Sequence, residues 1–395
     1  MMIDKVADSF PWDIPQKKPA RELSQAMTRL YDNYLTPRPE DNPLFTSFKY
    51  TRLKGFDYSN NDGTVSRRDP SKIISVNGLY YMWYTKRDTP VPPQGPEGCN
   101  NTAPSTDWDL ADIWYATSED GFTWDEQGIA VGRPEKPNWG WRSVCTPDIL
   151  VWEGKYYLYY QAFVEPSMVK GDNCPVTVSV ADSPDGPWTP HNQLVVPNGE
   201  PGSWDQYSVH GPYLLLYQDK IHFYYKAAFG DRPDYLVGLG LATAEHPLGP
   251  FEKHPLNPIM NSGHETTFFP FKEGIAAFAI RNGNESNSIQ FSPDGVNFSL
   301  AATTSMMPVG AKPYNPEAFT NTKYGHGIQW GICHFSDKKD PTTKHSYLGR
   351  FDCNLMLNDT SKDMKETDVV HAPSAFFAQR LSPKQAKARR TKALE

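Results

Sequence analysis

Three stretches of the chain repeat one phrase and decide the fold: Asn77–Tyr84 reads NGLYYMWY, Glu153–Tyr160 reads EGKYYLYY, and Gln218–Tyr225 reads QDKIHFYY. Each stretch begins with two turn-forming residues and continues as a strand rich in aromatic residues. This order is typical of the centre of a β-hairpin. Glu273–Ile280 (EGIAAFAI) and Tyr324–Ile332 (YGHGIQWGI) are weaker copies of the same phrase.

The five copies align on their turns and follow one another at intervals of 53 to 76 residues. The aligned positions are Gly78, Gly154, Asp219, Gly274 and Gly327. A second phrase follows each of the first four copies, as in Trp114–Trp124 (WYATSEDGFTW) and Val180–Trp188 (VADSPDGPW), where a tight turn leads to an aromatic residue. Repeats of four-stranded units predict an all-β fold, a five-bladed β-propeller. The alternative is a β-sandwich, which has no reason to repeat one phrase in register.

Composition agrees with a folded protein that binds neither nucleic acid nor membrane. Of the 395 residues, 38% are hydrophobic and 13% aromatic, which excludes disorder over most of the chain. A net charge of −7 argues against a nucleic-acid or anionic membrane partner, and no apolar run approaches the ~18 residues of a membrane helix. The five cysteines show no metal-ligand spacing and predict no disulfide framework. Met1–Asp13 lacks the pattern of a secretory signal, which leaves the periplasm and the cytoplasm as alternatives.

The ends of the chain differ from the repeats. Pro19–Tyr34 spaces Leu23, Met27, Leu30 and Tyr31 as in a helix, which predicts one or two short helices before Pro37. Helices this short must dock, either on their own domain or on a second subunit. We therefore divide the chain into a helical arm (1–50), a propeller domain (51–355) and a polar, partly basic tail (356–395).

Polar residues stand immediately before the central hairpin of each predicted blade, where the innermost strands of a propeller converge on its axis. They are Arg68 and Asp69 in the first blade, Thr146 and Asp148 in the second, His210 in the third, His264 and Glu265 in the fourth, and Tyr314–Glu317 in the fifth. Paired carboxylates around an axial pocket point to glycoside hydrolysis, in which one carboxylate activates water and an acid protonates the leaving oxygen.

Other residues have a functional and a structural interpretation. Arg68 either binds substrate hydroxyls or forms an ion pair with an axial carboxylate. Gln161 and Lys226 end matching strands, so they either point into the site or merely close a hairpin, and His210 lines the pocket or is a structural histidine. Trp141 lies in the loop PNWGWRS and is a candidate platform for a sugar ring.

Three phrases resemble glycoside hydrolase family 117: RRDPSKII, TPDILVWEGKYYLYYQ and, most specifically, NPIMNSGHE at Asn257–Glu265. The resemblance covers about residues 20–355. It implies an exo-acting, inverting α-1,3-(3,6-anhydro)-L-galactosidase that acts on neoagaro-oligosaccharides from red-algal agar, and a homodimer that swaps its N-terminal helices. Carried over to this sequence, Asp69 matches the general base, Glu265 the second catalytic carboxylate, and His264 a histidine proposed as the acid. Apart from the resemblance, the position of Asp148 before Ile149 has two interpretations: it either braces the inner strand or adjusts the pKa of its neighbours in the site.

One position departs from the family pattern. The family has an Asp, a third catalytic acid, where this chain has Gly211. Asp205 or Asp148 would have to supply a carboxylate, or the acid role falls on His264 and Glu265. The departure leaves two alternatives: another sugar, such as the anhydro-D-galactose of carrageenan or a family 43-like arabinoside, or a propeller that binds carbohydrate without catalysis. We expect no required cofactor, although a divalent cation in the channel is compatible with the residues.

Overall fold

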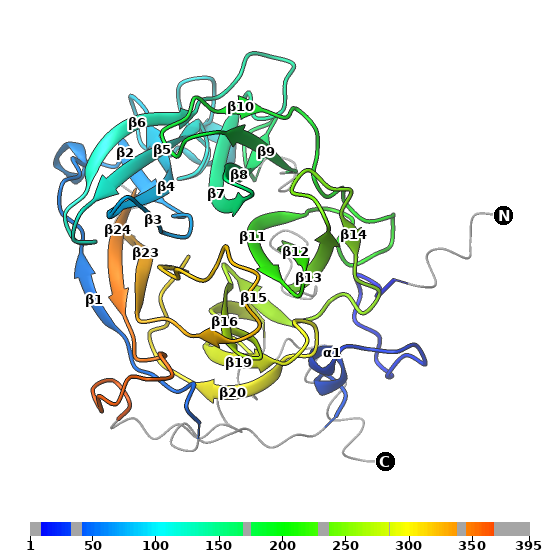
Figure 1. Cartoon of the computed structure of the whole chain (residues 1–395). Helices are drawn as coiled ribbons and strands as arrows, with labels where there is room; N and C mark the ends of the chain where they lie inside the picture. The colour runs from blue at the N-terminus through cyan, green and yellow to red at the C-terminus, as the bar shows by residue number, and fades with distance from the viewer. Residues whose placement is uncertain are drawn as a thin grey trace.

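Each blade is a small antiparallel sheet, and five such sheets surround one axis (Figure 1). The computed structural model describes residues 9–32, 42–168, 175–227, 237–283, 285–337 and 345–366. The five-bladed β-propeller predicted from the repeats is therefore confirmed. The basic segment 382–395 lies outside the described residues, as do parts of the predicted arm.

The blades follow one another along the chain. The first contains β2 (Val65–Arg68), β3 (Ile74–Val76), β4 (Leu79–Asp88), β5 (Ala111–Ser118) and β6 (Asp125–Val131). The second contains β7 (Ser143–Trp152), β8 (Lys155–Phe163), β9 (Val176–Ala181) and β10 (Thr189–Pro190). The third contains β11 (His210–Tyr217), β12 (Lys220–Ala227), β13 (Gly238–Ala244) and β14 (Glu252–Lys253).

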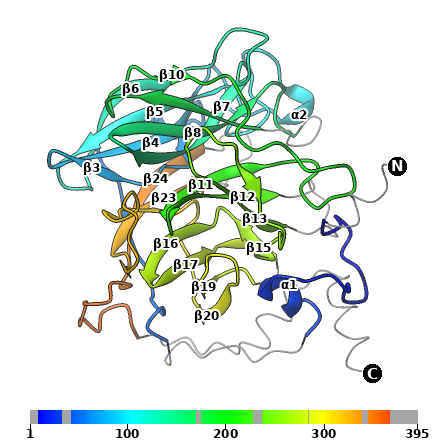
Figure 2. The ribbon, with the colours of Figure 1, turned by 45° about the vertical axis from the view of Figure 1, so that its right-hand side comes forward.

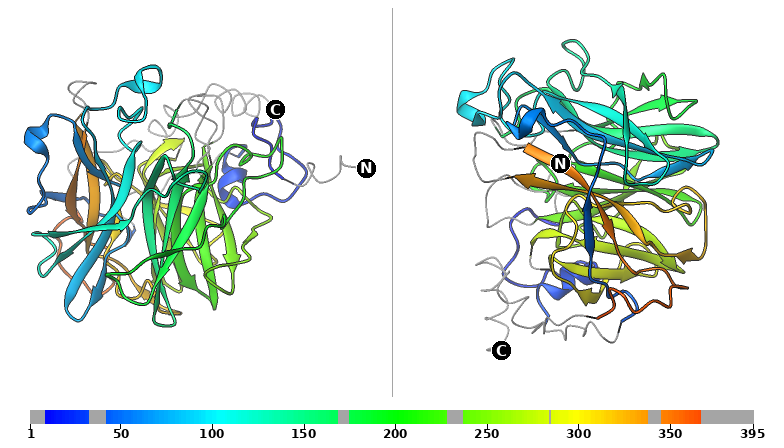
Figure 3. Two further views of the ribbon diagram at one scale, coloured as in Figure 1. Left: turned by 90° about the horizontal axis from the view of Figure 1, so that it is seen from above. Right: turned by 90° about the vertical axis from the view of Figure 1, so that its left-hand side faces the viewer.

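The fourth blade is the most elaborate. Its sheet contains β16 (Thr267–Lys272), β17 (Gly274–Ala279), β19 (Ser288–Ser292), β20 (Ser299–Thr303) and β22 (Gly325–His326). Two further strands, β15 (Ser262–His264) and β18 (Arg281–Gly283), pair with each other as a separate two-stranded sheet. The fifth blade is built from β21 (Lys312–Pro313), β23 (Trp330–Asp337), β24 (His345–Asp352) and β1 (Lys49–Arg52). Because β1 pairs with β24, the start of the propeller domain closes the ring against its end (Figure 3).

In the first three blades the repeated phrase forms the hairpin between two neighbouring strands. Asn77 and Gly78 have φ angles of 52° and 82°, and Glu153 and Gly154 have 49° and 77°. Two successive positive φ angles are those of a type I′ turn, whose twist matches the flanking strands. This is the physical reason for a glycine at the aligned position of the first two copies.

The aromatic residues fill the seams between neighbouring blades, where five apolar clusters lie. Their central members are Trp83 with Leu158, Tyr159 with Phe223, Tyr224 with Phe268, Phe278 with Phe351, and Tyr84 with Trp330. Each cluster joins two blades, so no blade buries its faces alone. The inward-facing edge of each blade is thereby left to carry polar residues.

The N-terminal arm docks on the outside of the ring. Its helix α1 (Gln25–Arg29) is shorter than the predicted span and begins at Ser24, whose hydroxyl accepts a hydrogen bond from the Met27 amide at 3.3 Å. Met27 and Leu30 are buried in the seam between the second and third blades. Arg29 forms an ion pair with Glu285 at 2.7 Å, and Figure 2 shows α1 beside β20. In this structure the arm therefore docks on its own chain.

The remaining regular elements are a short 3₁₀ turn (Ser59–Asn61) and the helix α2 (Gly95–Gly98), which lies in the loop between β4 and β5. Among the described residues, no helix has both the length and the apolar character that crossing a membrane requires. Four cysteines, Cys99, Cys145, Cys333 and Cys353, are free thiols.

We expect the stability of the propeller to fall between pH 7 and pH 5 because of His222 on β12. Burial, and then Lys220 and His254, lower its pKa from 6.5 to about 4. In that pH range the unfolded chain takes up a proton that the folded chain excludes, so acid favours unfolding by about 2 kcal/mol at pH 5. Urea unfolding of His222→Gln should show a loss smaller by about this amount. An equal loss in both proteins would contradict the assignment.

Candidate active site

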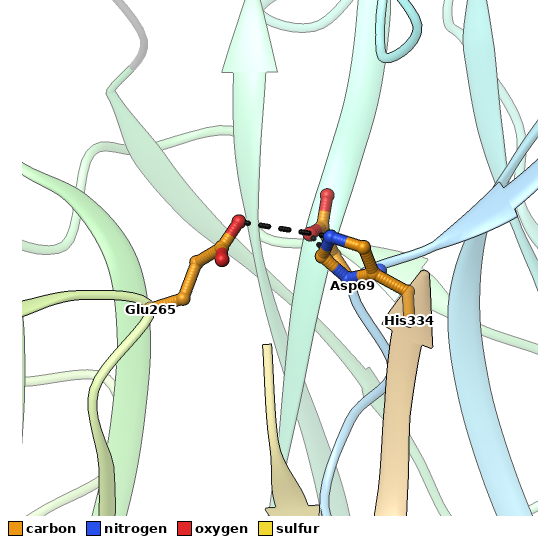
Figure 4. Close-up of side chains that lie close together, drawn as sticks. All are labelled: Asp69, Glu265 and His334. Atoms are coloured by element: carbon orange, nitrogen blue, oxygen red, sulfur yellow. Dashed lines mark hydrogen bonds and ion pairs between the residues drawn. The ribbon is translucent and has the colours of Figure 1, made fainter. Parts of the chain in front are cut away.

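The inner edge of every blade carries one residue with a left-handed backbone. The five residues are Asp69, Thr146, Gly211, Glu265 and Gly310, with φ angles of 45°, 51°, 63°, 63° and 62°. Such a residue interrupts the regular alternation of side chains between the two faces of the strand, and its own side chain therefore points in a different direction. We call these five positions the kink ring. Asp69 and Glu265 project toward one another from it (Figure 4).

A second set of residues holds the ring. The Thr146 amide donates to Oγ1 of Thr85 at 2.8 Å, the Gly211 amide to Oε1 of Gln161 at 3.3 Å, and the Asp69 amide to Nδ1 of His334 at 3.3 Å. In each case the acceptor belongs to the second strand of the preceding blade. The backbone of three kinks is thus fixed by a neighbouring blade.

Asp69 is buried, and its carboxylate contacts Arg68, Thr146 and His334. Its Oδ2 lies 2.8 Å from Nε of Arg68 and accepts a hydrogen bond from the Thr146 hydroxyl at 3.3 Å. Its Oδ1 lies 3.4 Å from Nδ1 of His334. A carboxylate held by a guanidinium and a hydroxyl is stabilised in its ionised form.

Glu265 faces Asp69 across the axis and is surrounded by two histidines. Its Oε1 lies 3.8 Å from Nε2 of His264. The same oxygen lies 3.9 Å from Nε2 of His334 (Figure 4). The side chain of His264 is 33% exposed, whereas that of His334 is 1% exposed. His264 therefore reaches the open side of the site, and His334 connects the two carboxylates from beneath.

Arg68 is the central cation of the site. It lies 2.8 Å from Asp69, 3.5 Å from Glu265 and 3.7 Å from Asp107. Burial alone lowers the pKa of the Arg68 guanidinium, but these three carboxylates outweigh burial and raise it above its ordinary value. The alternative in which Arg68 pairs with axial carboxylates is thus the one that the structure shows.

A loop between β4 and β5 covers the site beside Arg68. Asp107 in this loop is buried and accepts from Arg87 at 3.1 Å and from Ser346 at 2.6 Å. The ring of Trp108 lies over the Arg68 guanidinium at 4.8 Å. The sequence analysis singled out neither Asp107 nor Trp108.

Gly310 and His334 act together in the fifth blade. A β-carbon at position 310 would lie 2.6 Å from Nδ1 of His334, so only glycine leaves room for the imidazole. The sequence prediction that Tyr314–Glu317 completes the ring was wrong. The inner strand of this blade is only Lys312–Pro313, and Glu317 instead contacts the half-exposed His326.

Gly211 differs from Gly310 because the described residues leave more space beside it. A β-carbon built on it would meet one atom within 4 Å, the β-carbon of Lys226 at 3.9 Å. His210 and Lys226 are cross-strand partners and both are buried. Burial, and then Lys226, hold the pKa of His210 well below its usual range, so this histidine is neutral.

Asp148 lies beneath the ring in a buried cluster with two lysines. It accepts from Nζ of Lys72, from Nζ of Lys312 at 3.2 Å and from the Leu214 amide at 2.8 Å. Burial raises the pKa of Asp148, but the lysines and hydrogen bonds outweigh burial and lower it. Burial lowers the pKa of Lys72 to about 8.

The structure brings together most of the predicted site residues. Arg68, Asp69, Thr146, His264 and Glu265 form one cluster, Gln161, His210 and Lys226 lie around Gly211, and Asp148 lies beneath. Trp141 instead packs against Lys136, whose ammonium lies 3.8 Å from its ring. Asp205, considered as a substitute acid, is engaged by Lys253 at 2.6 Å and by the Tyr225 hydroxyl at 2.9 Å.

The sequence analysis did not identify His334 as a site residue, although its distance from the aligned turn position indicates one. It stands seven residues after Gly327, the aligned turn position of the fifth copy. Gln161 and Lys226 stand seven residues after Gly154 and Asp219. Extending the alignment by these seven residues would have identified the histidine.

Three side chains could hold a cation. One ligand atom each of Asp69, Glu265 and His334 lies within 4.8 Å of the others. Two carboxylate oxygens and an imidazole nitrogen suit a divalent ion such as zinc. Arg68 already contacts both carboxylates, so their charge is balanced by protein.

Comparisons with known proteins were made by sequence and by structure. Neither the family models nor the curated proteins contain a match to the chain. Among solved structures, the chain is similar to Zg3597, a family 117 glycoside hydrolase produced by the marine bacterium Zobellia galactanivorans. The two are 59% identical with a TM-score of 0.80, over 86% of this chain and 99% of that chain.

More distant structures share the fold alone. The catalytic domain of a GH62 α-L-arabinofuranosidase from Coprinopsis cinerea is 10% identical with a TM-score of 0.52, over 80% of this chain and 99% of that chain. A further glycoside hydrolase is 12% identical with a TM-score of 0.53, over 77% and 92% of the two chains.

Proposed function

The chain belongs to glycoside hydrolase family 117 and is a glycosidase, and from this premise we propose an exo-acting, inverting hydrolysis. The proposed substrate is an oligosaccharide of neoagaro type from red-algal galactan, from which a terminal α-1,3-linked 3,6-anhydro-galactose is removed. The observation that supports this proposal is the meeting of Asp69 and Glu265 on the propeller axis, under a loop that carries Trp108.

Asp69 is the proposed general base. Oδ2 is held by Arg68 and Thr146, which fixes the carboxylate and keeps it ionised. The other oxygen, Oδ1, lies 3.4 Å from Nη2 of Arg68 and 3.4 Å from Nδ1 of His334, and it is the oxygen that we propose accepts a proton from water. The Asp69 amide donates to His334, so that backbone and side chain are both positioned.

His264 is the proposed proton donor, with Glu265 as its partner. Inverting enzymes separate their two carboxyl groups by about 6.5–9.5 Å to admit both water and sugar. Oxygens of Asp69 and Glu265 lie within 4.8 Å, which leaves no room between them. Glu265 therefore acts through the partly exposed His264, whose imidazolium form its carboxylate stabilises.

The remaining residues would orient the sugar and adjust charge. Arg68 and Thr146 reach the reacting centre, and Trp108 offers an aromatic face better placed than Trp141. Asp148 would influence Asp69 through Lys312, whose charge it balances. Because Arg68 neutralises the carboxylates, we propose that hydrolysis requires no metal ion.

Hydrolysis of neoagarobiose, neocarrabiose and aryl arabinosides tests the proposal. We expect release of monosaccharide from neoagarobiose, and proton NMR should show that the first product anomer is inverted, because Asp69 delivers water directly. Initial retention would contradict the role of Asp69. If monosaccharide is released only from neocarrabiose or from an aryl arabinoside, the glycosidase assignment stands but the proposed sugar is wrong.

We also propose a homodimer in which the N-terminal arms are exchanged. The arm docks through Arg29 on Glu285, Ser24 on the Pro258 carbonyl and the Ala26 carbonyl on Asn261, and the same contacts can form between two subunits. Arg29→Glu should then shift the protein from dimer to monomer in light scattering, and Arg29→Glu with Glu285→Arg should restore the dimer. A dimer unchanged by the first variant would contradict the exchange.

A further inference from the structure

The strand that carries His264 has little support from a sheet. This strand, β15, pairs with β18 alone among the described strands, and the two form a sheet of their own. The segment before it, residues 257–261, lies outside the strands. Contacts outside the sheet therefore help to fix the backbone that presents His264 and Glu265.

Helix α1 of the N-terminal arm makes such contacts with the segment before β15 (Figure 2). The Ser24 hydroxyl, at the start of the helix, donates to the Pro258 carbonyl at 2.7 Å. Nδ2 of Asn261 donates to the Ala26 carbonyl at 2.9 Å. Ser24, Ala26 and Asn261 are at most 1% exposed, so little water competes for these hydrogen bonds.

A series of polar contacts also links Arg29, at the end of α1, to the first residue of β15. Arg29 binds both carboxylate oxygens of Glu285, at 2.7 and 2.9 Å. The Glu285 amide donates to Oγ of Ser262 at 2.7 Å, and this hydroxyl donates to Oδ1 of Asn261 at 3.3 Å. Since Asn261 in turn contacts Ala26 of α1, the contacts close on themselves. We call these five residues the arm network.

Tight packing continues from Ser262 to His264. A β-carbon at Gly263, which lies between them, would collide with Oγ1 of Thr266 and lie 2.8 Å from Cδ1 of Leu239. The backbone here has little free space, so a shift of Ser262 would displace His264 as well.

From these contacts we propose that Asn261 and Ser262 are positioning residues, through which the docked arm holds His264 and Glu265 in place opposite Asp69. The inference rests on the proposed glycosidase function and adds an element outside the propeller to its site. Because both positioning residues are buried and act through the backbone of β15, their loss should misplace the proton donor without removing a contact to the sugar. In the exchanged dimer proposed above, each arm would position the proton donor of the other subunit.

Kinetics of Asn261→Ala in the full chain test the inference, with whichever glycoside named above the protein cleaves. We expect kcat to fall about tenfold or more and KM to stay within about twofold, since misplaced reacting groups slow the chemical step rather than binding. Gln25→Ala is the matched control. Gln25 is an exposed residue of α1 whose side chain accepts from the Ser299 hydroxyl at 2.8 Å, so kcat should not change.

Arg29→Met perturbs the network from the arm side. Arg29 is partly exposed, so this variant should fold even if Asn261→Ala does not. We expect kcat to fall as in Asn261→Ala, and Arg29→Lys, which keeps a positive charge beside Glu285, should retain more activity than Arg29→Met. An unchanged kcat in Arg29→Met, or a loss that lies in KM instead, would overturn the inference.

A second readout does not depend on hydrolysis. The ¹⁵N resonance of Nε2 of His264, identified by its absence from His264→Gln, reports the surroundings of the imidazole. We expect its chemical shift to change more in Arg29→Met and Asn261→Ala than in Gln25→Ala. A resonance that moves no further than in the control would overturn the inference.

The two proposals fail separately. Hydrolysis with kcat unchanged in Arg29→Met would leave the glycosidase function intact and overturn the role of the arm. If no glycoside is cleaved, a shifted His264 resonance in Arg29→Met would still show that the arm positions this histidine, while the proposed function fails.

Discussion

Asp69→Asn is expected to lower kcat by about 10²–10⁴-fold while leaving sugar binding close to that of the unmodified protein. An amide cannot accept the proton of the attacking water, yet it keeps the size of the carboxylate and its contacts with Arg68 and Thr146. The loss should therefore appear in kcat rather than in KM.

Steady-state hydrolysis of the substrate identified above is the measurement, with Asp88→Asn as the matched control. Asp88 ends β4 in the same blade and is exposed. The control should keep full activity. If Asp69→Asn and the unmodified protein are equally inert while both bind sugar, the chain is a binding propeller and the catalytic assignment fails.

The fold was predictable from the repeats because every blade has to bury its faces against its neighbours. A blade cannot bury both faces alone, so aromatic residues recur at the same points of the copies, and the first three copies also form a type I′ turn. Gly78, Gly154, Trp83 and Tyr159 satisfy these requirements in the structure. The fifth blade was harder because its inner strand has two residues and no aromatic pattern.

The site was predictable where it follows the repeats. Asp69, Thr146 and Glu265 stand at equivalent points before their blades' hairpins, and the structure gives all three the same backbone. Asp107 and Trp108 could not be found this way, since a loop outside the repeats brings them to Arg68. Long-range placement of a loop leaves no local pattern in the sequence.

The position of Asp148 in the sequence did not reveal that it forms a buried ion-pair cluster. Its place before the hairpin suggested a site residue, but its partners are Lys72, Lys312 and the Leu214 amide. The kink residue Thr146 is redirected toward Asp69, whereas Asp148, two residues later, turns beneath the ring. A bulge between Cys145 and Asp148 separates the two functions.

Replacing Asp148 should therefore affect stability more than any surface charge. Asp148→Asn leaves the ammonium groups of Lys72 and Lys312 buried without their common carboxylate, and removing one partner of a buried ion pair typically costs about 3–5 kcal/mol. We expect a loss of this size in urea unfolding at pH 7. Asp112→Asn, which breaks a partly exposed pair with Arg133, should cost at most about 1 kcal/mol.

Two causes of the lower stability of Asp148→Asn can be distinguished: uncompensated buried charge and a lost hydrogen bond. If buried, uncompensated charge is responsible, Asp148→Asn combined with Lys72→Met and Lys312→Met should recover most of the stability, because apolar groups of similar volume then replace the ions. Raising the pH should also lessen the defect of Asp148→Asn. Burial lowers the pKa of Lys72 to about 8 while Asp148 raises it, so loss of the carboxylate lowers the pKa further and the buried ammonium sheds its proton more readily. A defect that persists in the triple variant and at high pH would instead assign Asp148 a role in hydrogen bonding to the Leu214 amide.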